Sequence, residues 1–169
     1  MLTIERADDG VPTARALLAG GLPVIEITLR TPAAIDAVRA VNAGAAFVVS
    51  PGTPAGLAQA LIEAPIPALP GCATVSEAMK LAALGFTVLR FFPAEPSAGV
   101  RWLKAVAEPL PDIQFCPTGG INPDNAASYL ALPNVVAVGG SWVTPPQAIA
   151  AGDFAGITAR ARLAAALRP

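Results

Sequence analysis

Two charged side chains interrupt apolar segments of this 169-residue sequence, and both could take part in chemistry. Glu26 lies within IEITLRT, and Arg90 lies within LRFFPAE. A charge inside a buried strand is costly unless it is paired or used, so Glu26 is a candidate for proton transfer. The alternative is a structural ion pair, with Glu26 facing Arg30 or Arg90. Residue types and spacing leave both interpretations open.

Arg30 and Thr31 follow the Glu26 segment directly. An arginine at the end of a strand suits a carboxylate or phosphate ligand, because its planar guanidinium can donate two parallel hydrogen bonds. A solvated loop arginine is the alternative.

Two Gly-Gly turns, each with a hydroxyl residue beside it, follow the last two apolar segments. They read Thr118-Gly119-Gly120 and Gly139-Gly140-Ser141. Exposed backbone N–H groups in such turns can hold a phosphate. Tight turns without a ligand are the alternative.

Short apolar strands alternate with alanine-rich helices along the chain. The predicted strands span residues 24–28, 46–50, 66–69, 87–92, 113–116 and 135–138. The predicted helices span residues 11–19, 32–41, 54–63, 76–85, 98–107 and 155–167, with one more after Pro123. This alternation indicates a parallel sheet. Because strand after strand ends in Pro or Gly, we expect a closed barrel rather than an open sheet, in one domain over residues 1–169.

Composition excludes several classes of function. The chain is 54% hydrophobic and 14% charged, but no stretch approaches the roughly 20 apolar residues of a spanning helix. A net charge of −1 gives no electrostatic basis for binding nucleic acid or a membrane. The absence of histidine removes Ser-His-Asp and Cys-His catalysis and the usual zinc centres. Cys72 and Cys116 are expected to be buried, reduced thiols of a cytoplasmic protein.

The segments IEITLRT, VVSPG, LPG, FFPAE, FCPTGGI and GGSWVTP together resemble the 2-keto-3-deoxy-6-phosphogluconate (KDPG) and 4-hydroxy-2-oxoglutarate (KHG) aldolases. The resemblance covers nearly the whole chain. It implies an α/β fold, a trimeric (β/α)8 TIM barrel, and a lyase of the Entner–Doudoroff route. Such a lyase cleaves its substrate to pyruvate and glyceraldehyde 3-phosphate through a lysine Schiff base, without a metal or other cofactor. The implied partners are a phosphorylated keto acid, pyruvate and further copies of the chain.

The resemblance also implies roles for individual residues. Glu26 matches the general acid/base, and Arg30 matches the arginine that binds the pyruvyl carboxylate. Position 90 matches the catalytic lysine. The implied substrate-binding residues are Arg30, Thr31, Pro51, Phe92, Thr118, Gly119, Gly120, Gly139, Gly140 and Ser141.

Position 90 is where this chain departs from the family chemically. The family reads FKFFPAE there, whereas this chain reads LRFFPAE. An arginine keeps its proton and is a poor nucleophile, so Arg90 should not form the iminium. Lys80 and Lys104 lie on predicted outer helices and offer no replacement.

The chain also departs from the family in length. Val41-Asn42 runs directly into AGAAF, where the family has roughly one further β/α unit. With the family's first strand also largely absent, we count about six full strands. A real deletion and residues omitted from the sequence both remain possible explanations of the junction.

Three hypotheses follow. The first is a lyase of this family that is impaired or inactive because of Arg90. The second is a non-catalytic oligomeric scaffold derived from the barrel. The third, a metal-dependent lyase with Glu26 as a ligand, is disfavoured because no histidine or second well-placed carboxylate is available.

Overall fold

A computed structural model describes residues 3–26, 47–64 and 66–167 of the chain. Its contacts form two compact units, one of residues 1–45 with 141–168 and one of residues 46–140. A single domain over residues 1–169 stays a prediction, and each unit is described here by itself.

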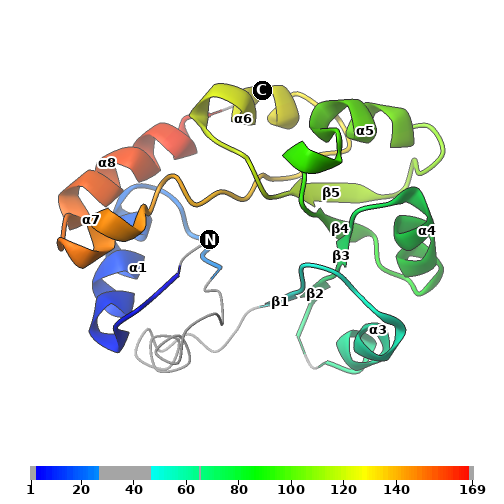
Figure 1. The fold of residues 1–169 in the computed structure, drawn as a ribbon, viewed down its shortest axis with the longest axis horizontal. Helices are drawn as coiled ribbons and strands as arrows, with labels where there is room; N and C mark the ends of the chain where they lie inside the picture. The colour runs from blue at the N-terminus through cyan, green and yellow to red at the C-terminus, as the bar shows by residue number, and fades with distance from the viewer. Residues whose placement is uncertain (1–2, 27–46, 65, 168–169) are drawn as a thin grey trace. The chain divides into compact units, whose positions relative to one another are not determined.

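The second unit contains short parallel strands (Figure 1). β1 (Val48–Val49) pairs with β2 (Ala68–Leu69), and Pro70 separates β2 from β3 (Gly71–Cys72). A second sheet has the order β3, β4 (Val88–Phe91), β5 (Gln114–Pro117). In this sheet Gly71, Arg90 and Cys116 lie at the same level on neighbouring strands. Every pairing is parallel, which confirms the expectation for the sheet.

Helices follow the strands of this unit. They are α3 (Ala55–Ile62), α4 (Val75–Ala83), the 3-10 helix η2 (Glu95–Ser97), α5 (Gly99–Val106) and α6 (Pro123–Leu130). The side chain of Thr74 caps α4 by accepting from the Glu77 N–H, and the Glu77 carboxylate accepts from the N–H groups of Ala73 and Thr74. These hydrogen bonds, that from Ala73 foremost, hold the pKa of Glu77 below its usual value.

The two faces of β4 have different environments. Phe91 stacks on Trp102 of α5 with 4.2 Å between ring centroids, and Trp102 meets Phe115 of β5 edge to face at 5.4 Å. Successive side chains of a strand point to opposite faces, so Arg90 projects away from this aromatic cluster. The face under α5 is thus an apolar core, and the other face carries the charge.

The two cysteines fall on opposite faces of this sheet by the same alternation. Cys72 is buried at 1% exposure, and burial, with a smaller contribution from Glu77, raises its pKa to about 12. The prediction of a buried thiol is confirmed for Cys72 but is wrong for Cys116, which is only partly buried. Cys116 shares its face with Arg90, outside the aromatic cluster.

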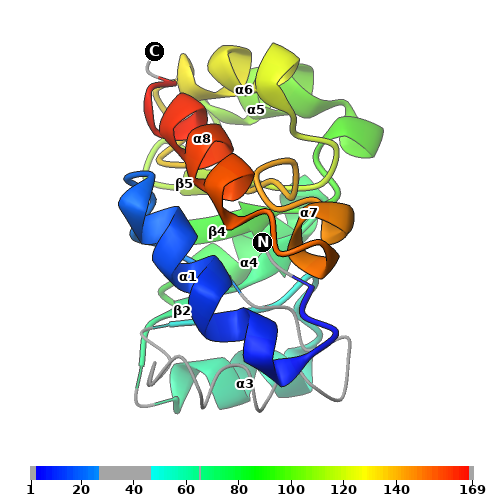
Figure 2. The same cartoon turned by 90° about the vertical axis from the view of Figure 1, so that its left-hand side faces the viewer.

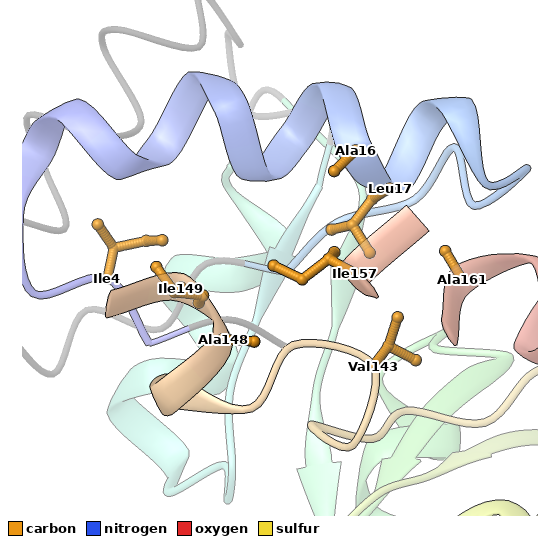
Figure 3. Close-up of a cluster of buried hydrophobic side chains, with 8 residues drawn as sticks. All are labelled: Ile4, Ala16, Leu17, Val143, Ala148, Ile149, Ile157 and Ala161. Carbon is orange, nitrogen blue, oxygen red and sulfur yellow. The ribbon is translucent and has the colours of Figure 1, made fainter. Parts of the chain in front are cut away.

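The first unit is helical in its described residues. η1 (Ala7–Asp9) leads into α1 (Gly10–Ala19), and α7 (Pro146–Ala150) precedes α8 (Phe154–Ala165). Figure 2 shows α1 beside α8, and the two helices share the largest helix contact of the unit. Figure 3 shows the core of this unit, to which α1, α7, α8 and their flanking segments contribute Ile4, Ala16, Leu17, Val143, Ala148, Ile149, Ile157 and Ala161.

Three element predictions need correction. The described part of the predicted strand 24–28, residues 24–26, is irregular, and residues 135–138 form only an isolated bridge from Val135 to Phe115. Both segments are apolar, but a strand also needs neighbours at the right register, which local sequence does not supply. α7 was not predicted, because five residues after a double proline look like a loop. The predicted helix 32–41 lies outside the described residues.

None of the helices in the described ranges combines the length and the apolarity needed to cross a bilayer.

Gly20 provides a test of the α1–α8 packing. A Cβ at Gly20 would overlap the Ala161 side chain and lie 2.8 Å from the Thr158 carbonyl oxygen. We expect Gly20→Ala to lower the free energy of unfolding in urea by about 1–3 kcal/mol. Gly56 is the matched control, since a Cβ there meets nothing within 4 Å. Gly56→Ala should raise stability by about 0.5–1 kcal/mol through helix propensity. Equal stabilities for the two variants would contradict this packing.

Candidate functional site

Arg90 is held in place at the end of β4. The residue is 4% exposed, and its Nε donates to the hydroxyl of Thr118 at 2.7 Å. Thr118, which follows β5, is itself 2% exposed. The guanidinium carbon also lies 5.0 Å from the centroid of the Phe92 ring, a cation–π contact. Three residues predicted from sequence for the site are therefore in contact.

The turn after β5, residues 118–120, is termed the first glycine turn. Gly119 and Gly120 have φ values of +92° and +84°, which L-residues rarely adopt. A Cβ on Gly119 would lie 3.1 Å from the Phe92 ring, and one on Gly120 would lie 2.6 Å from the Cβ of Glu95. Both conformation and space therefore require glycine at these two positions.

The carbonyl groups of the first glycine turn point back into the protein. The Gly119 carbonyl accepts from the Glu95 N–H at 3.1 Å, and the Gly120 carbonyl accepts from the Asn125 side chain at 3.0 Å. Within the described part of the chain, the Gly119 and Gly120 N–H groups donate to no protein acceptor. Consecutive N–H groups of this kind can bind an anion.

Further predicted residues lie at the ends of the neighbouring strands. Gly139 forms a parallel bridge with Thr118, and its N–H donates to the Pro117 carbonyl at 3.0 Å. On the other side, the turn that contains Pro51 is tied to Gly71, because the Gly71 N–H donates to the Ser50 hydroxyl at 3.2 Å. The strand ends beside Arg90 and Thr118 are thus joined to Gly139 on one side and, through Gly71, to the turn with Pro51 on the other, and they form one edge of the unit.

The remaining predicted residues are not placed against this edge. Glu26 and Ser141 belong to the first unit, whereas Gly140 is the last residue of the second unit. Arg30 and Thr31, like the Val41-Asn42 junction, lie outside the described residues. Their roles, and the pairing of Glu26 with Arg30 or Arg90, stay predictions.

The two lysines and the potential metal ligands of the described residues lie as follows. Lys80 on α4 and Lys104 on α5 are exposed, as the prediction of outer helices required. Within the described ranges, no three residues among His, Cys, Asp and Glu gather as a metal site would require.

One polar pair near the first glycine turn was missed by sequence analysis. The hydroxyl of Tyr129, on α6, donates to the carboxylate of Glu95, in η2. Tyr129 is fully buried although it lies on an alanine-rich helix. A single tyrosine among small residues was the available signal, but nothing local points to Glu95, which is 34 residues away.

Thr118 offers a direct test of the Arg90 contact. Thr118→Val keeps the shape but removes the buried acceptor of the Arg90 Nε. Because the guanidinium stays charged, we expect the free energy of unfolding in urea to fall by about 1–3 kcal/mol. Thr118→Ser, which keeps the hydroxyl, should lose less. A valine variant as stable as the parent protein would show that the hydrogen bond is unimportant.

Comparison with known proteins places this geometry in context. The 2-dehydro-3-deoxy-phosphogluconate aldolase of Pseudoalteromonas atlantica is 42% identical, over 98% of this chain and 88% of its own. A KDPG aldolase from Legionella pneumophila was solved with pyruvate captured as a covalent carbinolamine intermediate. It is 39% identical to this chain with a TM-score of 0.93, and the match covers 97% of this chain and 91% of the Legionella chain. The KDPG aldolase of Zymomonas mobilis ZM4, solved with 3-phosphoglycerate, is 38% identical with a TM-score of 0.92. The match covers 99% of this chain and 90% of the Zymomonas chain.

The matches also locate the missing length. The alignment with the Pseudoalteromonas enzyme spans 190 positions, whereas 98% of this chain is about 166 residues, so about 24 positions have no counterpart here. The family model for KDPG and KHG aldolase matches in two segments, residues 1–42 and 38–160. The interruption falls at the Val41-Asn42 junction, as the length argument predicted. This chain belongs to the KDPG/KHG aldolase family and has its α/β fold of the (β/α)8-barrel kind.

Proposed function

We propose that this chain is an aldehyde-lyase of the KDPG aldolase family that binds keto acids but is impaired in carbon–carbon cleavage, because Arg90 occupies the Schiff-base position. The observation that carries the proposal is the buried guanidinium at the end of β4, with its Nε held by Thr118.

The family chemistry requires a neutral amine at this position. In a class I aldolase the amine attacks the keto carbon, water leaves, and the resulting iminium accepts the electrons of the broken carbon–carbon bond. The guanidinium of Arg90 is delocalised and permanently protonated, so it offers no lone pair for that attack. Its charge and its donors suit a substrate carboxylate or the keto oxygen instead.

The site has groups suited to substrate binding, although it lacks the amine needed for cleavage. The N–H groups of the first glycine turn suit a phosphate or carboxylate, and Phe92 forms an apolar wall beside them. The related enzymes solved with pyruvate and with 3-phosphoglycerate support these two ligand classes. We assign the acid/base role to Glu26 and carboxylate binding to Arg30, with Thr31, Pro51, Gly139, Gly140 and Ser141 completing the substrate site.

Reduction in the presence of pyruvate tests the proposal. Pyruvate and sodium borohydride should leave the intact mass of the parent chain unchanged. Arg90→Lys should gain the mass of one reduced pyruvyl group, at a peptide containing residue 90. A lysine at this buried strand position can lose its proton through desolvation, which the exposed lysines on α4 and α5 cannot do as readily.

Arg101→Lys is the matched control, because it adds a lysine at an exposed position of α5. It should gain no mass. Adduct formation by the parent chain would refute the assigned effect of Arg90. A folded Arg90→Lys protein that forms no adduct would show that the missing internal segment, rather than residue 90, limits the chemistry.

A non-catalytic oligomeric scaffold is the second candidate function. Val75 and Met79, four residues apart on α4, are 37% and 58% exposed and offer apolar surface for a contact between copies of the chain. A homotrimer or larger homo-oligomer in the cytoplasm, as in the family expectation, would cover such side chains.

Light scattering separates the candidates when it is combined with ligand binding. We expect a trimer that also binds pyruvate or 3-phosphoglycerate, and Met79→Lys should shift it toward the monomer by placing a charge in the contact. A monodisperse oligomer that binds neither ligand would favour the scaffold. A monomer that binds these ligands would exclude it.

A further inference from the structure

The first glycine turn is fastened to the loop after β4. The Ala94 N–H donates to the Thr118 carbonyl at 2.8 Å, and the Glu95 N–H donates to the Gly119 carbonyl at 3.1 Å. The Cβ of Glu95 also limits the space at Gly120. The loop after β4 therefore fixes the direction of the Gly119 and Gly120 N–H groups.

Glu95 is in turn fixed from the opposite direction. Its carboxylate accepts from the hydroxyl of Tyr129, which is fully buried on α6. Burial, together with the Glu95 carboxylate, raises the pKa of Tyr129 well above its usual range, so the hydroxyl remains a donor at physiological pH. Gly99 leaves room for the pair, because a Cβ there would overlap the Tyr129 hydroxyl and lie 3.0 Å from the Glu95 carboxylate.

α6 is also connected to the first glycine turn through its own first turn. Asn122 caps the helix by accepting from the N–H groups of Asp124 and Asn125, and the side chain of Asn125 donates to the Gly120 carbonyl. The turn therefore lies inside a closed loop of contacts that runs from Glu95 through Tyr129 and α6 back to Gly120. The Glu95–Tyr129 hydrogen bond closes this loop.

We propose that Glu95 and Tyr129 are positioning residues for anion binding, which act by holding the first glycine turn in its binding geometry. The inference rests on the proposed function for the identity of the anion, a phosphorylated or carboxylated keto acid. Neither residue is assigned a contact with the substrate.

The proposal can be tested by the direction in which anion affinity changes when the negative charge of Glu95 is removed. Glu95 is an exposed carboxylate close to a site for anions, so simple electrostatics predicts tighter binding when it is removed. Positioning predicts the opposite. Tyr129→Phe isolates the hydrogen bond, because it changes neither charge nor ring.

Calorimetric titration with 3-phosphoglycerate is the first measurement. We expect Tyr129→Phe and Glu95→Ala each to weaken binding about 2- to 10-fold, the loss of one hydrogen bond. Glu95→Gln should stay within about twofold of the parent protein, since an amide oxygen still accepts from Tyr129. Glu63→Ala is the charge control: Glu63 is an exposed carboxylate on the far end of α3 that accepts only from Gln59 in the described structure.

Amide hydrogen exchange at Ala94 and Glu95, whose N–H groups donate to the Thr118 and Gly119 carbonyls of the turn, is the second measurement, and it needs no ligand. Tyr129→Phe and Glu95→Ala should speed exchange at these two amides while the strand amides of β4 and β5 stay protected. Glu95→Gln should restore the slow exchange. A merely structural role would raise exchange throughout the unit.

The outcomes separate the two proposals. A parent protein that binds no 3-phosphoglycerate defeats the proposed function, and the exchange of the Ala94 and Glu95 amides then decides the positioning role alone. A parent protein that binds, with Tyr129→Phe binding equally well and exchanging equally slowly, overturns the positioning role. If Tyr129→Phe does not fold, Glu95→Ala tests the same bond from its exposed side.

Discussion

The hydrogen bond from the Arg90 Nε to the Thr118 hydroxyl joins the ends of two parallel strands. Arg90 is 4% exposed, and a buried cation needs hydrogen-bond acceptors. One acceptor is the hydroxyl of Thr118, the first residue of the first glycine turn. The same contact therefore satisfies the cation, fixes the end of β5 and sets where the turn begins. Phe92, stacked near the guanidinium, extends this arrangement to Gly119.

Elements that are determined by interactions between sequence neighbours could be predicted from the sequence. The capped helix beginning after Thr74 and the strand around Arg90 were predicted within a residue or two, because caps and β-branched or aromatic runs act over short distances. Residues 135–138 were predicted as a strand, yet only Val135 forms a bridge. Pairing there depends on Phe115 and the turn after β5, which are distant in sequence.

The glycines of the site could be predicted from the sequence, whereas the Glu95–Tyr129 pair could not. Glycines beside a hydroxyl residue were recognisable at 118–120, and the structure adds the reason: positive φ and contacts with Phe92 and Glu95. Glu95 lies within the FFPAE segment, but nothing in the neighbouring sequence indicates a role for it. Only the fold brings the Tyr129 hydroxyl to it.

On the proposed function, anion binding and bond cleavage depend on different groups of this chain. The orientation of the Gly119 and Gly120 N–H groups follows from their backbone conformation and from the carbonyl contacts to Glu95 and Asn125. None of these contacts requires an amine at position 90. On the proposed function, Arg90 supplies charge and donors but no nucleophile, so it would remove one chemical step without changing the geometry of the first glycine turn. A family member altered in this way can lose catalysis before it loses its ligand, since the two properties reside in different groups.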